Sequence, residues 1–102
     1  MELEKDVESY FKNKVRNKGG LSLKWVSTIR GIPDQLVMFP NGKTVFVEMK
    51  RPNGTLRKSQ DKMTRTLRNL NQQVYVCYSK KQADMLVKEF QERGYFDASK
   101  IT

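Results

Sequence analysis

The chain has 102 residues, with 20 Lys and Arg against 11 Asp and Glu, so its formal net charge is +9. The chain has no histidine, which excludes catalytic triads and general bases that use histidine. Its single cysteine excludes internal disulfides and cysteine-rich metal sites. We expect one domain over residues 1–102, and the positive charge indicates a polyanionic partner such as nucleic acid. The acidic N-terminal segment lacks a signal-peptide core, and no run approaches the roughly 18 apolar residues of a membrane span. These features predict a cytoplasmic protein in a reducing compartment, without a membrane partner.

The first third of the chain is predicted to form a helix followed by a strand. Apolar residues at helical spacing predict a helix over residues 3–17. Residues 21–28 alternate and are rich in β-forming residues, which predicts a strand with Leu21, Leu23 and Trp25 on one face.

The middle of the chain is predicted to form a hairpin. The apolar run over residues 35–39 indicates a second strand, and residues 43–50 indicate a third. Between them, Pro40-Asn41-Gly42-Lys43 supplies an Asn-Gly pair that tolerates the positive φ of a tight turn.

The last part of the chain is predicted to add a helix, a strand and a helix. The second helix is expected over residues 56–70, with Thr55 or Ser59 as its N-cap. Residues 73–78 form the fourth strand, and the capping-box pattern of residues 79–82 opens the third helix. The order αβββαβα predicts an α/β fold. We expect a mixed sheet flanked by helices. Its third and fourth strands should run parallel and be joined by a right-handed crossover.

Three charged residues stand out for their chemistry. Glu48 and Lys50 lie two apart on the third predicted strand and therefore share a face, and Asp34 opens the strand paired with it. Two carboxylates and an ammonium thus converge, and a hard divalent cation, Mg²⁺ or Mn²⁺, would neutralise the carboxylates. An isolated Glu-x-Lys is more often a solvated charge pair, so from the residues alone both interpretations stay open.

The ordered set of short motifs resembles the PD-(D/E)xK nuclease superfamily and, within it, the virus-type replication-repair nuclease (VRR-NUC) domain. The motifs run in family order from about residue 7 to residue 87. They are Val7-Glu8, Lys24-Trp25-Val26-Ser27, Gly31-Ile32-Pro33-Asp34, Phe46-Val47-Glu48-Met49-Lys50, Gly54, Ser59-Gln60 and Val74-Tyr75-Val76. The resemblance implies a restriction-endonuclease-like core, and we expect a stand-alone domain.

The resemblance also implies roles for the central residues. Asp34 and Glu48 are the expected metal ligands, and the main-chain carbonyl of Met49 is a further one. Lys50 is expected to position or activate the attacking water.

Two residues outside this centre are assigned by the same resemblance. Glu8 is the expected helix carboxylate, which reaches the metal directly or through water, and Glu4 is the rival for that role. Gln60 is expected to hydrogen-bond the catalytic lysine or a phosphate. The alternatives are that Glu8 is an ordinary surface acid and that Gln60 is an exposed residue of a first helical turn.

Basic residues flank the predicted site in sequence. Residues 12–30 contain six basic residues and no acid, and residues 50–68 contain seven against Asp61. A charged helix is often only a solvated face, but this single-sign bias favours phosphate contacts. The expected DNA contacts are Lys24, Ser27, Arg30, Lys58, Lys62, Arg65 and Arg68.

The resulting hypothesis is a metal-dependent DNA endonuclease that cuts four-way (Holliday) junctions as a homodimer, in a phage or prophage setting. The junction and the dimer are implied by resemblance to stand-alone members of the family. The charge-balanced third helix and Tyr95-Phe96 are the better candidates for the dimer contact. Alternatives are a nicking or flap nuclease that needs a partner protein, a nuclease acting on RNA, and a non-catalytic nucleic-acid-binding module.

Overall fold

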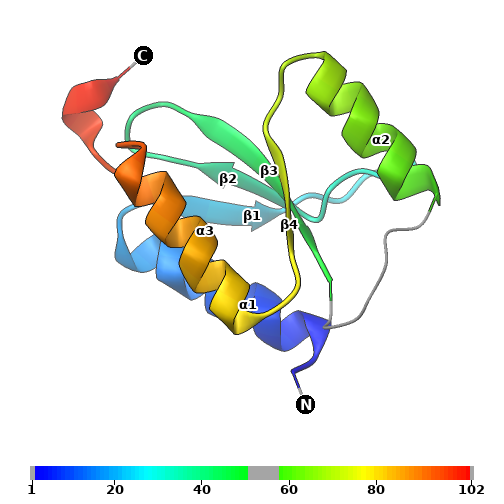
Figure 1. Cartoon of the computed structure of the whole chain (residues 1–102), viewed down its shortest axis with the longest axis horizontal. Helices are drawn as coiled ribbons and strands as arrows, with labels where there is room; N and C mark the ends of the chain where they lie inside the picture. Colours follow the sequence, from blue (N-terminus) through cyan, green and yellow to red (C-terminus); the bar gives the residue numbers. More distant parts are fainter. Residues whose placement is uncertain (1, 51–57, 102) are drawn as a thin grey trace.

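The elements follow the predicted order along the chain (Figure 1). The structure, a computed structural model, describes residues 2–50 and 58–101. Its elements are α1 (Glu4–Asn17), β1 (Leu21–Lys24), β2 (Gln35–Met38), β3 (Thr44–Met49), α2 (Lys58–Asn69), β4 (Val74–Cys77), α3 (Lys80–Glu92) and a short 3₁₀ turn (Ala98–Lys100).

The four strands form one mixed sheet in the order β1-β2-β3-β4. β1 pairs antiparallel with β2, β2 antiparallel with β3, and β3 parallel with β4, which confirms the predicted hairpin and crossover. In the hairpin turn, Gly42 has φ +91° and the Asn41 side chain accepts a hydrogen bond from the Lys43 amide. The Asn-Gly pair therefore makes the turn for the predicted reason.

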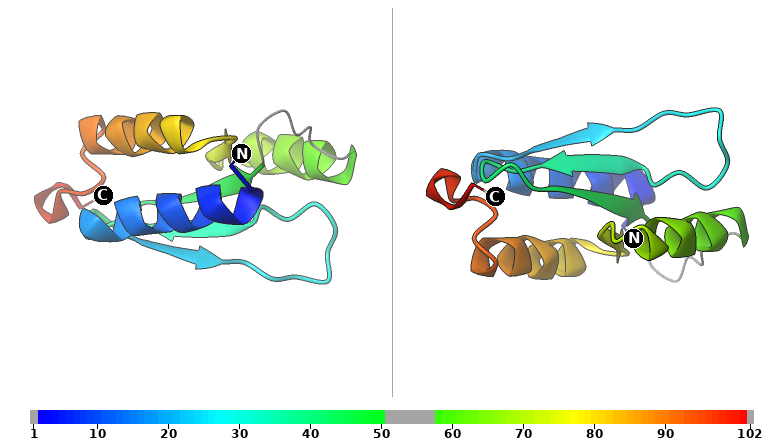
Figure 2. Two further views of the ribbon diagram at one scale, coloured as in Figure 1. Left: turned by 90° about the horizontal axis from the view of Figure 1, so that it is seen from below. Right: turned by 90° about the horizontal axis from the view of Figure 1, so that it is seen from above.

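The hydrophobic core lies between one face of the sheet and the helices α1 and α3, which pack against each other (Figure 2). α1 contributes Val7, Phe11 and Val15, all fully buried. The sheet contributes alternate residues such as Val37 and Val47. The helix-covered face of the sheet therefore forms one wall of the core. The ends of β2 and β3 remain available for a functional site.

The opposite face of the sheet is covered only in part, because α2 lies against β4 (Figure 1). Leu21 is 47% exposed and Leu23 is 44% exposed, whereas Ser22 between them is buried. The expected alternation of β1 is present, but its apolar side faces outward. The prediction of a strand to residue 28 is wrong, since β1 ends at Lys24 and the chain leaves the sheet in a long loop.

The two later helices differ in how well their sequences predict them. α3 begins as expected, with the Ser79 hydroxyl accepting a hydrogen bond from the Gln82 amide, although the Gln82 side chain binds the Tyr78 amide. In α2 the buried residues are the polar Gln60 and Thr64. Ser59 lies inside α2, so its assignment as the N-cap is wrong, and the rival Thr55 lies outside the described residues, as does Gly54.

The C-terminal region packs onto the core and is not a free apolar surface. Tyr95 is buried and Phe96 packs against the core cluster, with both rings next to Phe39. Tyr95 therefore has little free surface for the dimer contact expected there, whereas Phe96 is only partly buried. At the end of β4, Cys77 is fully buried as well, and its main-chain carbonyl accepts a hydrogen bond from the Lys50 amide. Among the described helices, none is both long and apolar enough to cross a membrane.

Candidate active site

Asp34 and Glu48 meet where β2 begins and β3 ends. The register pairs Gln35 with Val47, so Asp34, one residue before β2, lies beside Glu48 on the neighbouring strand. The Asp34 carboxylate accepts a hydrogen bond of 2.8 Å from the Met49 amide, which fixes its side chain across the strand pair. The predicted hairpin thus brings the two carboxylates together from positions 14 residues apart in the sequence.

Glu48 is an almost fully buried acid, with only 1% of its surface exposed. One oxygen, Oε1, accepts a 2.5 Å hydrogen bond from Gln60 Nε2 and lies 3.7 Å from Lys50 Nζ. Burial first, and then the charge of Asp34, raise the pKa of Glu48 to about 8, while Lys50 opposes the rise. A carboxyl with this pKa is held neutral near pH 7 until a cation compensates its charge.

Gln60 and Lys50 approach Glu48 from different elements. α2 supplies Gln60, which is buried, and the residue after β3 supplies Lys50, whose side chain is only 11% exposed. The sequence led us to expect that Gln60 binds the lysine or a phosphate, and the structure gives it Glu48 as a partner. Gln60 thus lies at the Glu48 carboxylate and helps to fix it, while its predicted contact with the lysine or a phosphate stays a prediction.

Glu8 lies on the helix-covered side of the sheet, in a hydrogen-bonded chain. Gln35 Nε2 donates to Glu8 Oε1 over 2.8 Å, and the Ser22 hydroxyl donates to Gln35 Oε1 over 3.0 Å. Gln35 is fully buried, and sequence reasoning did not single it out. The signal was present: a glutamine directly after Asp34 occupies the inward-facing position of an otherwise apolar strand.

The rival carboxylate, Glu4, acts on the site through its charge. The Glu4 carboxylate helps to raise the pKa of Glu48, and the Asp34 carboxylate raises that pKa more. Over residues 2–50 and 58–101, no three acidic, cysteine or histidine side chains cluster closely enough to hold a metal ion. Asp34 and Glu48 are therefore the candidate side-chain donors for direct contact, and the contact of Glu8 with the metal through water stays a prediction.

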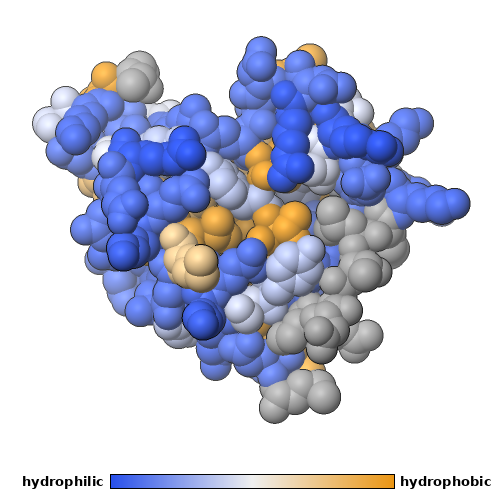
Figure 3. Space-filling model, in the orientation of Figure 1, coloured by the Kyte–Doolittle hydropathy of each residue, from blue (hydrophilic) through white to orange (hydrophobic). Residues whose placement is uncertain are grey.

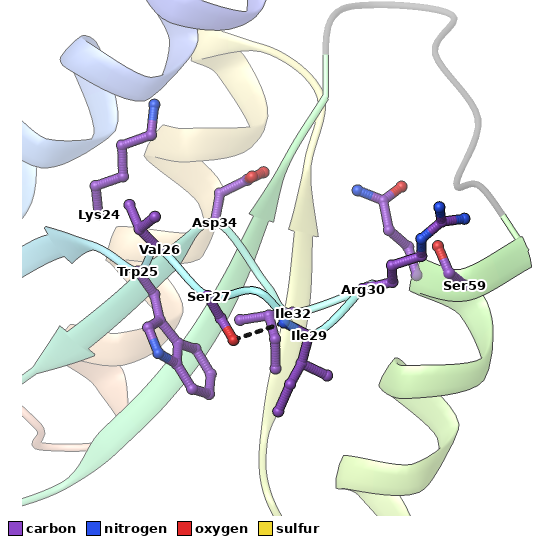
Figure 4. A pocket seen from close by; sticks show the side chains of 11 residues that line it. Lys24, Trp25, Val26, Ser27, Ile29, Arg30, Ile32, Asp34 and Ser59 are labelled. Atoms are coloured by element: carbon purple, nitrogen blue, oxygen red, sulfur yellow. Dashed lines mark hydrogen bonds between the residues drawn. The ribbon is translucent and has the colours of Figure 1, made fainter.

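A pocket of about 620 Å³ opens beside Asp34 (Figure 4). It contains all three DNA contacts predicted before β2, namely Lys24, Ser27 and Arg30. Its complete lining is Lys24, Trp25, Val26, Ser27, Ile29, Arg30, Gly31, Ile32, Asp34, Ser59 and Gln60. The loop between β1 and β2 therefore joins the predicted DNA contacts to the acidic centre and to α2.

Gly31 allows this loop to touch the start of α2. Its φ is +85°, and a Cβ built on it would lie 2.2 Å from the carbonyl oxygen of Ser59. Only glycine combines this backbone conformation with such an approach to another main chain. The contact positions α2, and with it Gln60, relative to Asp34.

The remaining predicted DNA contacts lie on α2, where strongly hydrophilic side chains dominate the surface (Figure 3). Lys58 and Lys62 are exposed, and Arg65 is exposed while paired with Asp61 over 3.3 Å. Arg68 has a structural partner, since its guanidinium donates a 2.7 Å hydrogen bond to the Val74 carbonyl. Arg68 thus anchors α2 to β4.

Comparisons with known proteins point to one family. The sequence model of the VRR-NUC domain family matches residues 11–81, which include Asp34, Glu48, Lys50 and Gln60 but begin after Glu8. A solved structure described as a VRR-NUC domain superposes with a TM-score of 0.79 at 34% identity, covering 85% of this chain and 96% of that one.

A phage protein is also similar. "Putative nuclease p44" of Acyrthosiphon pisum secondary endosymbiont phage 1 is 48% identical over 50 residues. The match covers 48% of this chain and 54% of the phage protein, so this chain spans about half the length of that relative.

Proposed function

This chain belongs to the VRR-NUC domain family, and we propose that it is a nuclease, specifically a divalent-metal-dependent DNA endonuclease that cuts four-way junctions as a homodimer. The observation that carries the proposal is the meeting of Asp34, Glu48 and Lys50 at one end of the β2–β3 pair. Structural and sequence matches to the family support the nuclease part. The metal, the DNA structure and the dimer are further parts of the proposal.

The donor atoms suit a hard divalent cation. Asp34, Glu48 and the main-chain carbonyl of Met49 offer oxygen ligands, which Mg²⁺ and Mn²⁺ prefer. Glu48 is buried beside a second carboxylate, and a cation is the simplest means of keeping both ionised at neutral pH. When bound, the cation supplies Lewis-acid catalysis, which favours ionisation of a water and neutralises charge on the phosphate.

The chain's own residues hold and orient the reacting groups. Gln60 and Lys50 both engage Oε1 of Glu48, which restricts the rotation of that carboxylate. The Lys50 ammonium lies near enough to orient the attacking water or to stabilise the developing charge on a phosphate oxygen. In-line attack of water on phosphorus breaks the bond to the 3′ oxygen and gives a 5′-phosphate and a 3′-hydroxyl.

DNA binding rests on dispersed basic residues. Lys24 and Arg30 line the pocket next to Asp34, and Lys58 and Lys62 extend the basic surface along α2. Phosphate contacts of this kind release counterions, so affinity falls with salt by a slope of about −0.9 per contact. Exchanging Lys58 and Lys62 together for alanine should weaken binding evenly across DNA sequences and reduce the salt slope. Retention of wild-type affinity and slope would exclude α2 from the DNA interface.

The dimer follows from the symmetry of the substrate. A four-way junction needs two matched nicks, and a two-fold dimer presents two sites in that relation through the same surface on each copy. The incompletely covered sheet face, with Leu21, Leu23 and Met38 exposed, offers apolar surface for such a contact. Leu23→Glu should convert a dimer to a monomer in light scattering, whereas loss of the dimer in Met85→Glu alone would assign the contact to α3, as the sequence predicts.

The deciding experiment compares four-way junction, flap, single-stranded and linear duplex DNA with Mg²⁺ or Mn²⁺. We expect paired nicks in the junction, no cleavage in EDTA and a dimer in light scattering. A monomer that cuts flaps or single strands but spares junctions would refute the junction and dimer proposals. DNA binding without cleavage of any substrate would favour a partner-dependent nuclease or a non-catalytic module.

A further inference from the structure

From the pocket between β1, the following loop and α2, we infer that this nuclease inserts an unpaired nucleotide of branched DNA next to its acidic centre, with the base against Trp25. The inference rests on the proposed function and specifies its substrate class. The pocket volume of about 620 Å³ lies within the roughly 300–1,000 Å³ range of small-ligand sites.

The pocket has two chemically different sides. Figure 4 shows Lys24 and Asp34 on one side of the loop and Trp25 with Ile29 on the other. A nucleotide has the same division, since its phosphate is charged and its base has apolar faces. Lys24 and Arg30 complement the phosphate, while Trp25 and Ile29 complement the base.

Trp25 is held as a stacking platform. Its ring stacks on Phe46 of β3, with centroids 5.4 Å apart and an angle of 28° between the planes. Trp25 is also one of the residues that line the pocket, so the contact with Phe46 fixes an aromatic residue at the cavity. A rigid aromatic ring of this kind loses little conformational entropy when a base stacks on it.

Paired DNA cannot use this platform. In a duplex each base is stacked between its neighbours, and the π-face needed for contact with Trp25 is covered. A nucleotide at a branch point or in a single strand can leave the stack and expose that face. The position of the pocket beside Asp34 would then place an unpaired nucleotide adjacent to the phosphate being cut.

The sole tryptophan of the chain provides a direct readout. Metal-free protein is titrated with a perfect duplex, a single strand and a four-way junction of equal nucleotide content, while tryptophan fluorescence is recorded. We expect quenching by the single strand and the junction and little change with the duplex. An equal response to the duplex would overturn the inference.

Changes in the DNA and in the protein test the same contact. Replacing each nucleotide near the junction centre in turn by an abasic residue should weaken binding roughly 10-fold at one position, with wild-type protein. Trp25→Leu should weaken binding of the junction but not of the duplex, Trp25→Phe should restore much of it, and Lys62→Ala should weaken both alike. No effect of any abasic position would refute base insertion even if Trp25→Leu failed to fold.

The inference and the proposed function fail separately. Metal-dependent junction cleavage with unchanged fluorescence and no abasic effect would refute base insertion alone. Quenching and an abasic effect without cleavage by either metal would leave the pocket as a nucleotide site and refute the proposal that this chain cuts DNA on its own.

Discussion

Replacing Glu48 by glutamine is expected to abolish cleavage while making the metal-free protein more stable. The Glu48 side chain is buried, and its pKa is raised from 4.5 to about 8, mainly by burial and by the charge of Asp34. Glutamine keeps the shape and can still accept the hydrogen bond from Gln60, but it carries no charge. The variant therefore loses the proposed metal ligand and also the energetic cost of burying an acid.

The magnitude follows from the difference between the folded and unfolded pKa values. Unfolded Glu48 ionises above pH 4.5, whereas the folded carboxyl stays protonated up to about pH 8, so unfolding releases a proton between these values. The contribution of this group is fully present below pH 4.5 and is lost at about 1.4 kcal/mol per pH unit as the pH rises toward 8. At pH 7 the loss amounts to about 3 kcal/mol.

The assay is urea unfolding in EDTA at pH 5, 6, 7 and 8 for wild type and Glu48→Gln. We expect the stability difference to grow in favour of the variant by roughly 2–3 kcal/mol between pH 5 and 7. Because other titrating groups are shared, the difference isolates Glu48. A difference that stays constant with pH would show that Glu48 has an ordinary pKa and would refute the reasoning.

Three further perturbations test other parts of the site. Asp34→Asn should remove Mg²⁺-dependent cleavage and the thermal stabilisation by Mg²⁺ while sparing DNA affinity; wild-type turnover would contradict its role as a ligand. Glu8→Ala should lower the free energy of unfolding in urea by about 1–3 kcal/mol, because it leaves the buried Gln35 amide without its acceptor, and Glu8→Gln should cost less. If both Glu8 variants instead lost cleavage equally and kept wild-type stability, Glu8 would be assigned to the metal. Gly31→Ala should reduce kcat at least 10-fold by displacing α2 from Asp34, as checked by single-turnover cleavage, and unchanged turnover would exclude the loop contact.

The central part of the site could be predicted because its information is local. The Asn-Gly turn fixes the pairing of β2 with β3, and the pairing then brings Asp34 next to Glu48. The spacing of two residues places Lys50 beside Glu48. Turn chemistry and strand periodicity therefore suffice for the acidic centre.

Other features depend on contacts that no local pattern encodes. The alternation of β1 identifies two faces but does not say which is buried. α1 packs on the face of Ser22 because the core residues of β2 and β3 lie on that side, and Gln35 and Glu8 complete a polar chain that satisfies the buried hydroxyl. Similarly, α2 buries Gln60 because the buried Glu48 needs a donor. Tertiary contacts override the apolar pattern at both places.

The buried Cys77 is a natural reporter of local opening in the part of the fold that lies behind the site. Its thiol is inaccessible and its pKa is raised to about 11, chiefly by burial, so it is unreactive toward alkylating reagents in the closed state. Cys77 belongs to the core cluster that α3 covers, and its main-chain carbonyl accepts the hydrogen bond of the Lys50 amide, so reagent access requires α3 to move away from the sheet behind the catalytic end. The alkylation rate of native protein thus measures how often the scaffold of the site opens, independently of catalysis.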